Sequence, residues 1–121
     1  MTKDQNTKQY DLEERILCFA RRVREFVRTL PKTLADIEDS RQLINASGSV
    51  GANYIEANEV LSKKDYLMRI KICRKEAKEG RCWLRLVDTG GNHKSEHERQ
   101  SLESEVTELT HIFGSIVTKS K

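Results

Sequence analysis

The stretch from Ser62 to Asp88 constrains the fold most, because it has the pattern of one long helix with three distinct faces. A seam of apolar or small residues recurs every three or four positions, as a face that meets a core requires: Ile70, Cys73, Ala77, Gly80, Leu84 and Val87. A basic stripe follows about 100° further around the axis: Lys71, Arg74, Lys78, Arg81 and Arg85. A second apolar row lies beyond the stripe: Met68, Ile72, Trp83 and Leu86. Because a helix with one partner needs only one apolar face, we expect this helix to pack on its own domain and on a second surface.

Helical periodicity recurs in three other stretches. The first alternates apolar residues at steps of four and three until Pro31, which cannot continue a helix. Each later helix follows a capping pattern in which Ser or Thr precedes an acidic residue by three positions: Thr33 with Asp36, Ser62 with Asp65, and Ser95 with Glu98. The sequence therefore predicts an all-α chain with a disordered tail over residues 1–10 and four helices over about 11–30, 34–60, 63–88 and 95–118.

The second helix contains an unusual run of small residues from Ala46 to Asn53. Its two glycines, Gly48 and Gly51, each cost a helix up to about 1 kcal/mol relative to alanine. The helical period nevertheless continues through Tyr54. We therefore predict that the run is helical and that its small side chains let a neighbouring helix approach closely.

Composition supports long helices over a fold rich in turns. Charged residues make up 34% of the chain, which has only one proline and six glycines. Four amphipathic helices with short connections predict an antiparallel up-and-down four-helix bundle. No apolar run is long enough to span a membrane, and the first residues lack the pattern of a signal peptide. The three cysteines form no CxxC pair, which favours buried, reduced thiols and a cytoplasmic location.

Positive charge is concentrated on the central helix. Residues 61–88 hold nine basic and four acidic side chains, a net +5, whereas the whole chain carries +3. A second basic patch lies on the first helix and includes Arg21, Arg22 and Arg28. Cations at helical spacing suit a phosphate backbone, so both patches are candidates for nucleic-acid binding. The alternative is a solvated helix face neutralised by pairs within the helix.

The second and third helices also resemble a known family. The residues that carry the resemblance are the run Ser49–Ala57, the triplet Lys75–Ala77, Glu79, and the pair Trp83–Leu84. They are similar to the small four-helix-bundle proteins encoded within intervening sequences of bacterial large-subunit ribosomal RNA genes. Their relatives are the accessory proteins of diversity-generating retroelements. Gly80 and Cys82 depart from the family pattern, which usually has Ser or Thr and an aromatic residue there.

The resemblance implies a homopentameric barrel of bundles. In the retroelement relatives it also implies a basic surface that engages nucleic acid and a reverse transcriptase. Such an assembly suits the second apolar row, which we interpret as a subunit interface with Trp83 as its aromatic anchor. The alternative is that the third helix lies centrally and contacts two neighbours of its own bundle.

Several polar residues occupy the middle of the predicted helices: Asn53, Glu56, Lys75, Glu76 and Glu79. Paired carboxylates can perform acid–base catalysis. Buried polar networks that fix the register of helices are the commoner use of such groups, and we favour that reading.

Residues 93–97 match the H-x-x-E-H pattern of some zinc proteases. That pattern requires both histidines on one helical face, and Ser95 is the predicted cap, so we expect His93 to lie outside the helix. No nucleophile, base and oxyanion donor converge, and no glycine-rich phosphate loop is present. We therefore expect no enzyme activity, no metal and no cofactor.

These observations lead to one hypothesis and one alternative. We predict a non-enzymatic, oligomeric protein whose basic surface binds RNA or DNA without sequence specificity, as an accessory factor to a reverse transcriptase. The alternative is a structural or protein-interaction module that does not bind nucleic acid directly.

Overall fold

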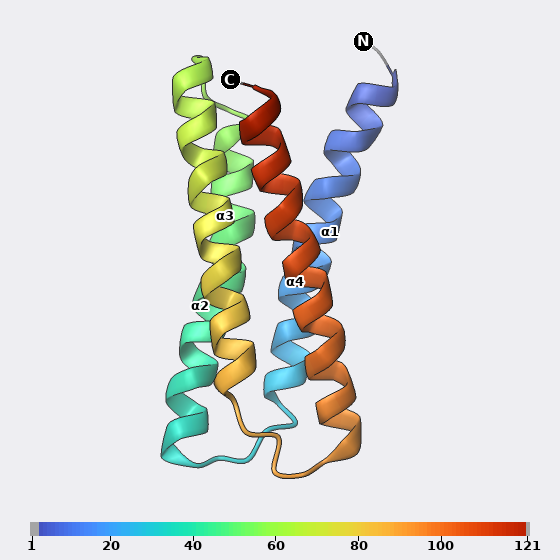
Figure 1. Cartoon of the computed structure of the whole chain (residues 1–121), viewed down its shortest axis with the longest axis vertical. Helices are drawn as coiled ribbons and strands as arrows, with labels where there is room; N and C mark the ends of the chain where they lie inside the picture. Colours follow the sequence, from blue (N-terminus) through green and yellow to red (C-terminus); the bar gives the residue numbers. More distant parts are fainter. Residues whose placement is uncertain (1–2, 121) are drawn as a thin grey trace.

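The computed structural model describes the backbone of residues 3–120 and the side chains of residues 11–120. It consists of four helices, α1 (Lys3–Val27), α2 (Leu34–Ala57), α3 (Lys63–Leu86) and α4 (His93–Lys119). Successive helices run in opposite directions and lie side by side (Figure 1). Each helix contacts the two helices beside it, in the cyclic order α1–α2–α3–α4. The predicted all-α four-helix bundle is thereby confirmed.

Apolar side chains from all four helices meet along the axis of the bundle. The largest that are fully buried include Phe19 and Phe26 of α1, Leu43 of α2, and Phe113 of α4. The predicted seam of α3 is buried along its whole length, from Ile70 to Val87. The 3.6-residue period of the sequence thus identified the buried face of the central helix correctly.

The run of small residues in α2 is helical, as predicted, and lies against α1. Gly51 is buried, and a Cβ atom placed on it would lie 3.5 Å from both Ile16 Cγ2 and Leu17 Cδ2. A Cβ atom placed on Gly48 would lie 3.5 Å from Arg24 Nη2. These small residues therefore face α1, and a methyl group at either position would make ordinary van der Waals contact with it.

The ends of the helices differ from the prediction. α1 begins at Lys3, so residues 3–10 are helical and not a disordered tail. No proline or glycine interrupts this segment, and the helix simply continues through it. Its N-terminal end diverges from the other helices (Figure 1). α2 and α3 end at Ala57 and Leu86, slightly before the predicted positions 60 and 88.

Two of the three predicted caps are correct. The hydroxyl groups of Thr33 and Ser62 accept hydrogen bonds from the backbone N–H groups three residues later, at 3.2 and 3.1 Å. The Ser95 cap is wrong, because Asn92 caps α4 through a hydrogen bond from Ser95 N–H to Asn92 Oδ1 at 2.9 Å. Asn92 is an equally good capping residue and comes first in the chain. Ser95 is instead buried and donates its hydroxyl hydrogen to Thr29 Oγ1 at 2.9 Å.

Candidate functional site

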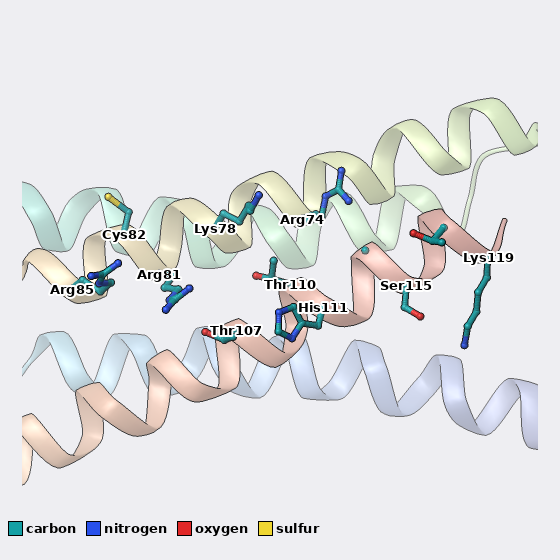
Figure 2. A pocket seen from close by; sticks show the side chains of 12 residues that line it. Arg74, Lys78, Arg81, Cys82, Arg85, Thr107, Thr110, His111, Ser115 and Lys119 are labelled. Carbon is teal, nitrogen blue, oxygen red and sulfur yellow. The ribbon is translucent and has the colours of Figure 1, made fainter. Parts of the chain in front are cut away.

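An open groove of about 850 Å³ runs between α3 and α4 (Figure 2). Twelve residues line it, seven of them from α4: Arg74, Lys78, Arg81, Cys82 and Arg85 of α3, with Thr107, Thr110, His111, Gly114, Ser115, Thr118 and Lys119 of α4. None of the twelve is acidic. We call this feature the α3–α4 groove.

One wall of the groove is the predicted basic stripe of α3. Arg74, Lys78, Arg81 and Arg85 follow one another at steps of four, three and four residues, which places them on one helical face. Within the described part of the chain, none of the four forms an ion pair. Lys71 belongs to the same stripe but lines a neighbouring hollow, together with Lys75 and Glu79. The groove thus has an unneutralised cationic wall.

The other wall is neutral apart from its end and is rich in hydroxyl groups. Thr107, Thr110, Ser115 and Thr118 line it, with Lys119 at the C-terminal end of α4 (Figure 2). The Thr110 hydroxyl donates to the Val106 carbonyl oxygen at 2.8 Å, so its lone pairs are directed outward as acceptors. His111 is the only aromatic ring among the lining residues.

The absence of a side chain at Gly114 leaves room for Arg74 to reach across from α3. A Cβ atom placed on Gly114 would lie 3.7 Å from Arg74 Nη1 and 3.9 Å from its Cδ. Arg74 is half-buried as a result, whereas Lys78, Arg81 and Arg85 are exposed. The Arg74 side chain therefore lies close to Gly114 of α4, within the length of the groove.

Sequence reasoning missed the α4 wall. It treated helix 4 only as an apolar seam, although positions 107, 110, 111, 114, 115 and 118 recur at helical spacing and carry no acid. That pattern is visible in the sequence. Only the packing of α3 beside α4 shows that it faces the basic stripe.

The predicted cations of α1 do not line the groove, and each lies beside a carboxylate. Arg22 Nε lies 3.3 Å from Glu98 Oε2 of α4, and its Nη2 donates to Ser101 Oγ at 2.7 Å. Arg28 pairs with Glu25 at 2.7 Å, and Arg21 lies 3.7 Å from Glu14. The candidate interface therefore narrows to the basic stripe of α3.

Arg15 shows the same pairing between α1 and α4 more strongly. Its Nε and Nη2 atoms donate to the two oxygens of Glu105 at 2.8 and 3.0 Å, and Nη2 lies 2.9 Å from Glu108 Oε1. Hydrogen bonds to the two carboxylates raise the pKa of the Arg15 guanidinium above its usual value. Arg15 and Arg22 thus attach α1 to α4, whereas Arg21 and Arg28 pair with acidic residues of α1.

The second apolar row of α3 is divided between exposed and packed residues. Met68 and Leu86 are more than half exposed, at 54% and 58%. Ile72 and Trp83 are half-buried, and Trp83 packs against the core of its own bundle. Leu34 and Ile37 of α2 are further exposed apolar residues, which the sequence analysis did not single out.

The five polar residues predicted as a buried network do not form one in the single chain. Asn53 is half-buried, and its Oδ1 accepts a hydrogen bond from Arg69 Nη1 at 3.0 Å. Lys75 is exposed and lies 3.7 Å from Glu76 and 3.6 Å from Glu79. Glu56 is exposed as well. The prediction treated these positions as inward-facing, but the helices turn Glu56, Lys75 and Glu79 toward solvent.

The histidine prediction is also corrected. His93 is the first residue of α4, so His93 and His97 lie one turn apart in the same helix, and both are exposed. Among the described residues, no group of three His, Cys, Asp or Glu side chains is placed to hold a metal ion.

Two of the three thiols are exposed, contrary to prediction. Cys18 and Cys82 face the surface, and only Cys73 is buried. Cys73 donates its S–H to the Val50 carbonyl oxygen at 3.6 Å. Burial raises the pKa of this thiol to about 12.

In the described part of the chain, no helix has both the length and the apolar character that crossing a membrane requires.

Comparison with known proteins identifies a matching family and a similar crystal structure. A family model described as "23S rRNA-intervening sequence protein" matches residues 8–115. The structure is similar to the crystal structure of a protein of unknown function from the S23 ribosomal protein family of Bacteroides thetaiotaomicron. That match has a TM-score of 0.75 and 26% sequence identity, and it covers 88% of this chain and 97% of the other. No curated protein matches the chain.

Proposed function

Because the chain belongs to the 23S rRNA-intervening sequence protein family, we propose that it is a non-enzymatic protein that binds the phosphate backbone of nucleic acid through the α3–α4 groove. One observation carries this proposal. Four cations face a row of hydroxyl groups, and none of the twelve lining residues is a carboxylate.

The chemistry of the groove suits phosphate. Three of the four α3 cations are arginines, whose planar guanidinium groups bind phosphate oxygens through two parallel N–H donors. Hydroxyl groups on the facing wall supply further hydrogen bonds to phosphate or sugar. No motif that reads base edges is present, so the binding is expected to be independent of sequence.

We further propose that the protein acts as an oligomer, a pentamer by family resemblance, with a reverse transcriptase as a partner in the cell. The exposed side chains of Met68 and Leu86 support an interface at the second apolar row, because solvated apolar side chains gain free energy when a partner covers them. Five copies would carry a formal charge of five times +3, or +15, which would strengthen attraction to a polyanion. Light scattering tests the proposed oligomer, and a measured mass equal to that of one chain would contradict it.

A second candidate function is a protein-interaction module that does not bind nucleic acid. The observation in its favour is that Leu34, Leu61, Met68 and Leu86 are each more than half exposed. Partner capture that survives loss of the groove's charge, in a protein that never binds nucleic acid, would support this candidate.

A titration of the full chain with fluorescently labelled RNA and DNA at increasing salt tests the main proposal. Binding at low salt that weakens linearly in log–log form is expected, because phosphate contacts release counterions. Absence of binding to every nucleic acid at low salt, or binding that salt does not weaken, contradicts the proposal.

A further inference from the structure

The two walls of the α3–α4 groove differ in chemistry, and this difference restricts the form of nucleic acid that fits. We propose that the groove takes a single strand, with its phosphates along α3 and its sugars and bases against α4. This inference rests on the proposed function, because it specifies which nucleic acid the same site binds.

The length of the cationic wall suits a short segment of one strand. The helix rises about 17 Å between Arg74 and Arg85, at about 1.5 Å per residue. A stacked strand presents one phosphate per about 3.4 Å, so about five phosphates fit along this wall. Four of the five cations of the groove lie in this single row on α3, and the fifth, Lys119, lies apart from them at the C-terminal end of α4. One phosphate row, and not two, therefore finds cationic partners.

The facing wall suits the other side of the same strand. In a single strand the sugars and bases are free on the side away from the phosphates, and they need neutral hydrogen-bonding and apolar contacts. Thr107 and Thr110 offer both a hydroxyl and a methyl group there, and the His111 ring provides an aromatic surface of the kind on which bases stack. Figure 2 shows the three residues on α4, across from Arg81 and Lys78.

The far edge of α4 disfavours a duplex. A duplex carries a second phosphate strand across a groove about 6 or 12 Å wide, and its bases are turned inward. Glu103 and Glu108 line an adjoining hollow that shares Arg81, Thr107 and His111 with the α3–α4 groove, and Glu108 is paired with Arg15. Glu103 forms no ion pair among the described residues, so it would repel a second phosphate strand laid across α4 more strongly than a strand confined to the groove.

Fluorescence anisotropy with a labelled ten-nucleotide strand and its duplex, each as RNA and as DNA, tests the inference. At equal ionic strength we expect the single strand to bind at least tenfold more tightly than the duplex. Four phosphate contacts to a single strand predict a slope of log affinity against log salt of about −2.8. A preference for RNA would assign the α4 hydroxyl groups to the ribose 2′-hydroxyl, and equal affinity for RNA and DNA would assign them to the bases and the rest of the sugar.

Two outcomes are distinguishable from one another. If the duplex binds as tightly as the strand or more tightly, this inference is wrong and the proposed function stands. If neither form binds at low salt, the proposed function fails as well.

Two sets of variants test the role of each wall. His111→Phe should retain binding to the single strand, and His111→Lys should lose about fivefold despite its added charge, if the ring stacks on a base. The reverse order would contradict stacking. Glu103→Gln should narrow the preference for the single strand by strengthening duplex binding, and Glu59→Gln, exposed in the connection between α2 and α3, is the control. Equal effects of the two glutamate variants would contradict a role for the acidic edge.

Discussion

The carboxylate of Asp36 accepts a hydrogen bond from the backbone N–H of Asp88 at 2.9 Å. This contact joins the first turn of α2 to the connection between α3 and α4. Asp36 is 2% exposed, and its own backbone N–H is held by the cap at Thr33. Its second oxygen, Oδ2, has no hydrogen-bond partner among the described residues. Asp36 lies in the first turn of α2, a position where the helix dipole favours acidic residues.

We expect Asp36→Ala to lower the free energy of unfolding by about 1–3 kcal/mol, because it leaves the Asp88 N–H without its partner and removes an acid from a helix N-terminus. Asp36→Asn keeps an acceptor oxygen and should cost less. Urea denaturation followed by circular dichroism measures both. Asp39→Ala, half-buried on the same helix, is the control, and an equal loss for the control would contradict the assigned role.

We expect Lys78→Gln with Arg81→Gln to weaken nucleic-acid binding about tenfold and to reduce the salt slope by about 1.4, since two phosphate contacts are lost. The control pair is Lys75→Gln with Arg41→Gln. It removes the same charge from exposed positions outside the groove, where each cation lies near a glutamate. Anisotropy titrations compare the two proteins. Similar losses would show that only net charge matters and that the groove is not the binding site.

The close approach of α1 to α2 predicts opposite effects of two substitutions at Gly51. Gly51→Ala should stabilise the fold by up to about 1 kcal/mol, because alanine is a better helix former and its Cβ would make ordinary contacts at 3.5 Å. Gly51→Leu should destabilise it by about 1–3 kcal/mol, because the longer side chain meets Ile16 and Leu17. Urea denaturation curves measure both. Leucine and alanine of equal stability would contradict the close contact.

The three cysteines should differ in reactivity. In the native protein at pH 8 we expect iodoacetamide to modify Cys18 and Cys82 within minutes and to leave Cys73 unmodified. Burial raises the pKa of the Cys73 thiol to about 12, so almost no thiolate is present there, and the side chain is inaccessible as well. Mass spectrometry of peptides identifies the modified residues. Labelling in urea, where all three should react, is the control, and rapid native labelling of Cys73 would contradict its burial.

The sequence predicted the helices and the buried seam of α3, because hydrophobic periodicity depends only on neighbours in the same helix. It did not predict the partners of Arg22 or Arg15, because their carboxylates lie on α4, far along the chain. Within the sequence of α1 alone, these acidic partners are not evident. The α4 wall of the groove was missed for the same reason. Hydroxyl residues such as Thr107 and Thr110 become a site only when α3 lies beside them.

Both walls of the α3–α4 groove belong to helices that are consecutive in the chain and joined only by residues 87–92. Contacts between near neighbours in sequence form quickly, since little chain entropy is lost in bringing them together. The groove therefore belongs to a helical hairpin, and its geometry depends mainly on the two helices α3 and α4. Divergence in α1 among homologous proteins would alter how that helix packs against the bundle, and it would leave the binding surface between α3 and α4 in place.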